Sequence, residues 1–145
     1  MAEKNRDSEH RLTLPALRES FAALKEWLER LFPGMAVPPD AGKKLLIAAD
    51  EIFTNAASYA YPTGTAGTVE VTVESDPART EITLTFSDSG IAYNPLDAPP
   101  PDLGKPLAER EPGGLGIFLV KRLTDAQEYR RENGRNILVL KKKMR

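Results

Sequence analysis

Two side chains in the first half of the sequence have types and spacing that suit catalysis. Glu51 and Asn55 are four residues apart in a stretch with helical periodicity, so both should project from one helix face. A carboxylate can act as a general base, and an amide oxygen can ligate Mg²⁺, which keeps waters and takes phosphate oxygens. The same pair could instead be a solvated polar edge of the helix.

A second candidate is the acidic residue in Phe86-Ser87-Asp88-Ser89-Gly90. Alternation along the preceding strand places Asp88 on the core-facing side with Ile82 and Leu84. A carboxylate there needs a partner, and it could accept a hydrogen bond from the exocyclic amine of a purine. Gly90 would let a ligand approach the backbone closely. Alternatively, Asp88 could be a turn residue that caps its own loop.

The third candidate is the run Gly113-Gly114-Leu115-Gly116-Ile117 before an apolar helical stretch. Three glycines in four residues at a helix N-terminus would expose backbone N–H groups to a phosphate. The run could also be a flexible hinge. It is neither a Walker A sequence nor a GxGxxG dinucleotide fingerprint.

Several elements must position these residues, and periodicity predicts them. Leu12 and Leu14 indicate a short strand that stops at Pro15, and a leucine stripe predicts a helix from Pro15 to Pro33-Gly34. The remaining elements are a deep helix from Pro39 to about Ala60, strands 68–75 and 81–87, a helix at 115–123 and a hairpin of 127–131 with 136–142. Asn133-Gly134 predicts a type I′ turn in that hairpin. This order predicts an α+β fold, a two-layer sandwich with helices on one face of a mostly antiparallel sheet.

Composition excludes several classes of protein. The 145 residues carry 20 Lys and Arg against 21 Asp and Glu, which argues against a general nucleic-acid binder. There is no cysteine and one histidine, so disulfides, thiol chemistry and a two-histidine metal site are ruled out within one chain. No apolar run is long enough for a transmembrane helix and no secretory signal is visible, so we expect a cytoplasmic protein. We expect a flexible N-terminus at residues 1–9 and a single domain at 10–145.

Half of the 12 prolines lie between Pro95 and Pro112. Proline forbids a regular helix and lowers the entropy of an open loop. We therefore expect the loop of residues 91–112 to be extended and semi-rigid, with few internal hydrogen bonds. A helix spanning Pro99–Pro106 would contradict this expectation.

The order of the three candidate motifs resembles the ATP-binding boxes of the GHKL superfamily, which includes gyrase, histidine kinases and MutL. Within it the chain is most similar to the anti-sigma factor serine/threonine kinases. The matching stretches run from Asp50 to Ala56, from Asp88 to Pro95 and from Gly113 to Val120. The resemblance implies the Bergerat ATP-binding fold.

The resemblance also implies roles for individual residues. Glu51 would be the general base, Asn55 would hold Mg²⁺, and Asp88 would read the adenine amine above Gly90. The backbone amides of five consecutive residues would wrap the phosphates: Gly113, Gly114, Leu115, Gly116 and Ile117. The loop from Tyr93 to Pro112 would be an ATP lid.

Four further positions join this implied ATP site. Asn94 follows the Asp88 motif, and Lys105, or else Arg110, could neutralise γ-phosphate charge. Tyr59 stands where many members have His, and Asn136 stands where members often have Thr near the adenine. Asn136 can still hydrogen-bond a water beside the base.

The expected function is that of an ATP- and Mg²⁺-dependent serine/threonine protein kinase acting as an anti-sigma factor. It would phosphorylate an anti-anti-sigma protein of the STAS type and sequester a sigma factor, with a possible homodimer and no nucleic acid or membrane as partner. The alternative is a non-catalytic, ATP-gated adaptor in partner switching. A detached ATPase domain of another GHKL type is a third possibility, which the length of the chain disfavours.

Overall fold

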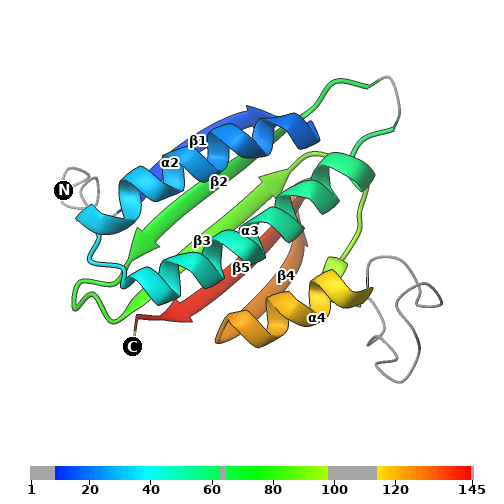
Figure 1. The fold of residues 1–145 in the computed structure, drawn as a ribbon. Helices are drawn as coiled ribbons and strands as arrows, with labels where there is room; N and C mark the ends of the chain where they lie inside the picture. Colours follow the sequence, from blue (N-terminus) through cyan, green and yellow to red (C-terminus); the bar gives the residue numbers. More distant parts are fainter. Residues whose placement is uncertain (1–8, 63–64, 98–113, 145) are drawn as a thin grey trace.

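The computed structural model describes residues 9–62, 65–97 and 114–144 (Figure 1). Its elements, in chain order, are β1 Glu9–Pro15, the 3-10 turn η1 Arg18–Ser20, α2 Phe21–Gly34, α3 Pro39–Tyr59, β2 Thr68–Ser75, β3 Glu81–Asp88, the 3-10 turn η2 Pro95–Asp97, α4 Gly114–Leu123, β4 Ala126–Glu132 and β5 Arg135–Lys143.

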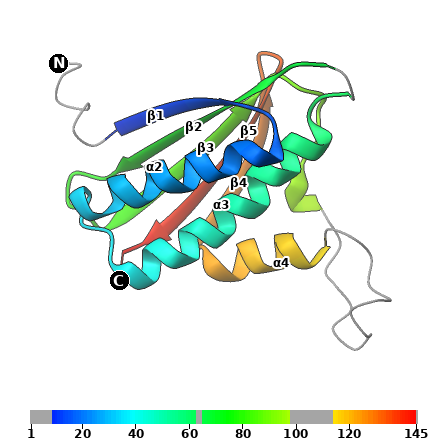
Figure 2. The same ribbon diagram turned by 45° about the horizontal axis from the view of Figure 1, so that its top comes forward.

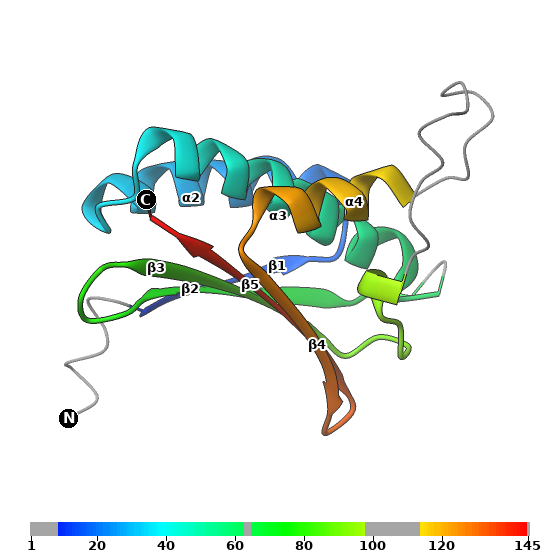
Figure 3. The same ribbon diagram turned by 90° about the horizontal axis from the view of Figure 1, so that it is seen from below.

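The five strands form one antiparallel sheet in the order β1-β2-β3-β5-β4. All three α-helices of the described chain lie on one face of this sheet, as Figures 2 and 3 show. The expected α+β fold, a two-layer sandwich with a mostly antiparallel sheet, is therefore confirmed. None of the described helices is long and apolar enough to cross a membrane.

The core lies between the sheet and the long helix α3. Alternate residues of β2 and β3 point toward the helices and are fully buried, as the period of a strand requires. Small residues of α3, such as Ala48 and Ala49, are buried as well and let this helix approach the sheet closely, while Phe53 fills the remaining space. The packing of α3 against the sheet fixes the position of Glu51 and Asn55, which this helix carries.

The first helix begins later than the leucine stripe predicts. β1 continues through Pro15, which pairs with Thr68 of β2, and α2 starts only at Phe21. Consequently Leu17, which we expected on the buried stripe, is 51% exposed. Pairing with β2 overrides the helical pattern here, and Pro15 is tolerated because β1 is an edge strand.

The structure describes the beginning of the proline-rich loop but not the rest of it. Its first residues contain the short turn η2, so this part is not wholly extended. The stretch Pro99–Pro106, for which we predicted no helix, lies outside the described residues. So does the segment 1–8, while β1 begins at Glu9, inside the expected flexible terminus.

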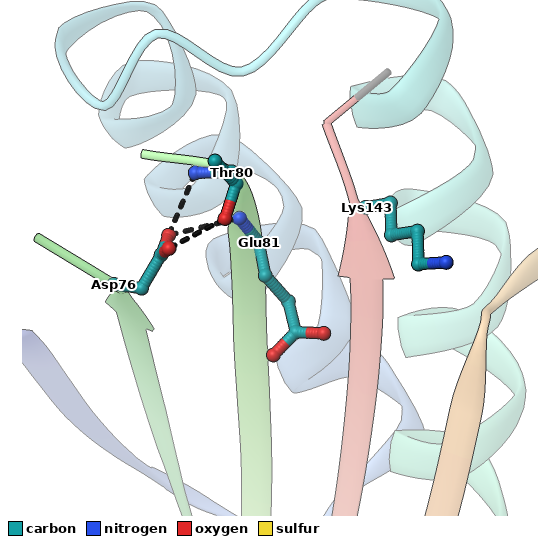
Figure 4. Close-up of a pocket in the computed structure, with 4 residues that line it drawn as sticks. All are labelled: Asp76, Thr80, Glu81 and Lys143. Carbon is teal, nitrogen blue, oxygen red and sulfur yellow. Dashed lines mark hydrogen bonds between the residues drawn. The ribbon is translucent and has the colours of Figure 1, made fainter. Parts of the chain in front are cut away.

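Two turns keep the strands in register. Asn133 and Gly134 have φ of 51° and 75°, which confirms the predicted type I′ geometry between β4 and β5. At the opposite end of the sheet, Asp76 closes the β2–β3 connection (Figure 4). Its carboxylate accepts hydrogen bonds from the backbone N–H groups of Thr80 at 2.7 Å and Glu81 at 2.9 Å, and from the Thr80 hydroxyl at 2.5 Å.

These hydrogen bonds hold the pKa of Asp76 below its usual value of 3.8, with the Thr80 hydroxyl as the largest cause. A lowered pKa in the folded state stabilises the protein above the unfolded pKa, and this stabilisation is lost as pH falls through the folded pKa. We expect Asp76→Ala to lower the free energy of unfolding near pH 7, and the difference from wild type to shrink at about pH 2.5. Urea denaturation at both pH values measures this. Glu74→Ala, which removes an exposed carboxylate from the same hairpin, is the control and should show no such convergence.

Candidate functional site

Asp88 and Asn136 form the buried polar pair at one end of the sheet. They are direct partners in the register of β3 with β5, and they are 6% and 5% exposed. Asp88 Oδ1 accepts hydrogen bonds from the Asn136 amide and from the Gly90 backbone N–H, both at 2.9 Å. Both hydrogen bonds go to Oδ1, so neither donor occupies Oδ2. The interpretation of Asp88 as a loop cap and the interpretation as a ligand acceptor are thus compatible.

The side-chain amide of Asn136 joins the sheet to the segment of chain that follows β3. Its nitrogen also donates to the Ile91 carbonyl at 2.7 Å. Its oxygen accepts from the Tyr129 hydroxyl at 2.5 Å, from Arg131 Nη1 at 3.1 Å and from the Tyr93 N–H at 3.3 Å. Buried polar groups need such partners, and a fully satisfied network fixes one arrangement of its members.

Two arginines that we did not select from the sequence hold the segment around Asp88. Arg131 donates to the Gly90 carbonyl at 2.8 Å. Arg135 donates to the hydroxyls of Ser87 at 2.8 Å and of Ser89 at 2.7 Å. A signal for Arg131 was present, because a two-residue turn at Asn133-Gly134 places residue 131 opposite Asn136.

Glu51 and Asn55 project from the same face of α3, as their spacing predicts, and they are bonded to each other. The Asn55 amide donates to Glu51 Oε2 at 3.0 Å, which leaves the amide oxygen of Asn55 as an acceptor. Burial raises the pKa of Glu51 above its usual value, and the charge of Asp50 adds to this, while the hydrogen bond from Asn55 opposes it. Among the described residues, no cluster of three or more acidic, His or Cys side chains could hold a metal ion.

The first turn of α4 lies against Glu51. A Cβ at Gly116 would collide with the Glu51 carboxyl group, so any larger residue at this position would displace that carboxyl group. α4 begins at Gly114, and the first four N–H groups of a helix have no partner within it. The backbone amides of residues 114–117 and the Glu51 carboxylate therefore occupy one region, while the Ile117 side chain is buried in the core.

The presence of glycine at position 90 has a structural explanation of its own. A Cβ at Gly90 would collide with the backbone carbonyl of Ala60, and the N–H of Ile91 donates to that same carbonyl at 2.7 Å. The absence of a side chain at Gly90 thus allows the Asp88 segment to approach the end of α3 closely.

The other predicted site residues are placed as follows. Tyr59 is 54% exposed at the end of α3, and its ring centroid is 5.8 Å from that of Tyr93. The Asn94 side chain accepts from the Leu96 N–H at 2.9 Å and so begins the turn η2. Lys105, Arg110 and Gly113 lie outside the described residues, as does the side chain of Leu115.

Asp88 and Asn136 border a small cavity between α3 and the sheet. Ile52, Ala56, Phe86 and Leu138 are among the residues that form its apolar wall, and its volume is about 20 Å³. This space holds about one water molecule, whereas sites for small ligands usually measure about 300–1,000 Å³. A larger, open pocket of about 520 Å³ lies at the far end of the sheet beside Asp76, and it contains none of the predicted site residues.

The fold and this arrangement of residues define a GHKL-type nucleotide-binding domain, and comparison with known proteins agrees. The model of the histidine kinase-like ATPase domain matches residues 14–142. The chain therefore belongs to the histidine kinase-like ATPase family.

Among curated proteins, the serine/threonine-protein kinase BtrW of Bordetella bronchiseptica is 34% identical over 96 residues, covering 66% of this chain and 66% of BtrW. The serine-protein kinase RsbW of Halalkalibacterium halodurans is 29% identical over 128 residues, covering 85% of this chain and 76% of RsbW. These relatives confirm the resemblance to the anti-sigma factor serine kinases.

Two solved structures share the fold. The RsbU and RsbW domains of a Mycobacterium tuberculosis protein match 92% of this chain and 32% of theirs, with a TM-score of 0.62 and 12% identity. The histidine kinase domain of a blue-light activated histidine kinase from Erythrobacter litoralis matches 90% of this chain and 62% of its own, with a TM-score of 0.55 and 14% identity.

We predict that Asn136→Ala destabilises the protein. The substitution leaves the Tyr129 hydroxyl and the Ile91 carbonyl without their partner, and such losses cost about 2–3 kcal/mol when the groups are buried. Chemical denaturation measures the change in the free energy of unfolding. Arg130→Ala removes an exposed side chain of the same hairpin and should change that free energy by less than about 0.5 kcal/mol. Equal effects of the two substitutions would contradict the central position of Asn136.

Proposed function

We propose that this protein is an ATP- and Mg²⁺-dependent serine/threonine protein kinase that acts as an anti-sigma factor. The observation that carries the proposal is the position of Glu51, whose carboxylate lies against the first turn of α4 and beside Asn55. A base and helix-terminal amides in one region suit phosphoryl transfer, which depends mainly on positioning and on stabilising charge.

Asp88 suits recognition of adenine. Its Oδ1 is held by two donors, which orients the carboxylate and leaves Oδ2 to accept from the exocyclic amine of the base. Isoleucine, alanine and leucine side chains of the adjoining cavity wall would contact the faces of the ring. The amides of residues 114–117, at the positive end of α4, would bind the phosphates.

The oxygen of Asn55 is the protein ligand that suits Mg²⁺, because its amide nitrogen is already engaged by Glu51. A bound Mg²⁺ would supply neutralisation of phosphate charge. Glu51 would accept the proton of a serine or threonine hydroxyl on the partner as that oxygen attacks the terminal phosphorus of ATP. The bond from this phosphorus to the oxygen that bridges to the β-phosphate would break, and ADP would leave. The raised pKa of Glu51 brings it closer to the pKa at which a general base works well at neutral pH.

The partners are proposed from the resemblance to the anti-sigma factor kinases. BtrW and RsbW are named as serine kinases, and the solved neighbour combines an RsbW domain with an RsbU domain. On this basis we propose an anti-anti-sigma protein of the STAS type as the phosphoryl acceptor and a sigma factor as the protein that is sequestered, with cytoplasmic localisation and a possible homodimer.

Glu51→Gln should abolish most of the phosphoryl transfer while leaving ATP binding nearly intact. Removing a general base lowers the rate by about 100-fold or more, and the amide keeps the size of the side chain. The measurement is transfer from γ-labelled ATP to a purified STAS protein of the same organism. Asp50→Asn is the control, because Asp50 is the adjacent but exposed carboxylate of α3; it should retain most of the rate.

If Glu51→Gln transfers phosphate as fast as wild type, Glu51 is not the base. If wild type binds ATP and the sigma factor without any transfer, the chain is an adaptor and not a kinase.

Asp88→Asn should weaken ATP binding by about 10–100-fold. The substitution replaces a charged acceptor with an amide, and hydrogen bonds to charged groups contribute about 1.5–3 kcal/mol. Calorimetric titration with ATP, with and without Mg²⁺, gives the affinities. Asp97→Asn, in the exposed turn of the same connection, should bind ATP as wild type does. Unchanged affinity in Asp88→Asn would overturn the assignment of adenine to this residue.

A further inference from the structure

The cavity beside Asp88 is too small for the ligand that its walls suit. Asp88 and Asn136 supply the polar side, and Ile52 and Leu138 are part of the apolar side, but only about 20 Å³ remains open between them. A purine base needs many times the space of one water molecule. Something that lines this cavity must therefore move before a base can enter.

Two lining residues come from the connection after β3 rather than from α3 or the sheet: Tyr93 and Pro95. The Tyr93 hydroxyl oxygen is buried and has no hydrogen-bond partner among the described residues. Burial raises the pKa of Tyr93, and the charges of Glu51, Tyr59 and Asp88 raise it further. The phenol thus lies in the field of both predicted site carboxylates, in the region proposed for the nucleotide.

The position of this hydroxyl is unfavourable, because a buried polar group without a partner loses its hydrogen bonds to water. The backbone on both sides holds it there. We call residues 91–97 the strap. Asn136 binds the strap at the Ile91 carbonyl and the Tyr93 N–H, at 2.7 and 3.3 Å, and Lys121 Nζ of α4 donates to the Leu96 carbonyl at 3.0 Å. Pro95 is buried in the same segment.

We propose that the Tyr93 side chain is a plug of the nucleotide pocket: it occupies the space of the adenine base in the free protein, and ATP binds when it leaves. This inference rests on the proposed function, since it takes the pocket beside Asp88 to be the adenine site. Release returns the hydroxyl to water, which favours opening, while the strap's hydrogen bonds favour closure. The same Asn136 amide binds both Asp88 and the strap, so movement of the strap changes the partners of the group that orients the adenine acceptor.

Calorimetric titration of ATP into Tyr93→Ala, Tyr93→Phe and wild type tests the plug. If about one molecule in ten is open, Tyr93→Ala should bind ATP roughly tenfold more tightly than wild type, because apparent affinity scales with the open fraction. Tyr93→Phe is the matched control: it keeps the ring and removes only the unpartnered hydroxyl, so it should bind ATP no more tightly than wild type. Weaker binding by Tyr93→Ala would show that Tyr93 contacts the nucleotide instead, and would overturn the plug.

A second readout follows the side chain itself. The protein is labelled with 3-fluorotyrosine, and the Tyr93 fluorine resonance is assigned as the one absent from Tyr93→Phe. We expect a solvent-protected resonance without nucleotide and a solvent-exposed one at saturating ATP. A resonance that is exposed from the start, or that stays protected at saturation, would refute the proposal.

The outcomes separate the plug from the proposed function. If wild type binds ATP and Tyr93→Ala binds no more tightly, only the plug is wrong. If Tyr93→Ala binds ATP and wild type does not, the plug is supported in its strongest form. If neither binds ATP, the proposed function is wrong and the plug is overturned with it.

Discussion

The hydrogen bond between Asn136 and Asp88 is the interaction on which the site depends. A buried carboxylate at the end of a strand is costly unless it is bonded, and the Asn136 amide both bonds it and orients it. The remaining hydrogen-bonding positions of that amide are taken by Tyr129, Arg131 and the strap. The β4–β5 hairpin is therefore more than a cover for the core, because its register decides where Asp88 points.

The two halves of the site are positioned by different means. Asp88 is held by a hydrogen-bonded network across three strands, whereas Glu51 is held by packing of α3 on the sheet and by direct contact with Gly116. Helix α3 brings the proposed base to the first turn of α4, and the end of the sheet carries the proposed acceptor for adenine. The charges of Glu51 and Asp88 both raise the pKa of Tyr93, so one side chain of the strap is influenced by both halves of the site.

Much of this arrangement could be predicted from the sequence, and the parts that could not have physical reasons. The strands, α3, the turn at Asn133-Gly134 and the inward face of Asp88 follow from period and turn chemistry, which act locally. The start of α2 was misplaced because pairing of Pro15 with β2 is a long-range contact that no local pattern contains. Gly90 and Gly116 were recognised as special, but their actual neighbours, Ala60 and Glu51, depend on how distant elements pack. The burial of the Tyr93 hydroxyl depends on the same packing, and no spacing rule indicates it.

One of the strands that support the site, β4, is only weakly protected from solvent. β4 lies at the edge of the sheet, is bonded on one side only, and has no buried residue. Amide protons on such a strand exchange with solvent through small local openings, well before the core unfolds. Each opening of β4 withdraws Tyr129 and Arg131 from Asn136. The local stability of one edge strand thus limits how long the Asp88 carboxylate stays in place, and warming should loosen this end of the protein while α3 and the core strands remain folded.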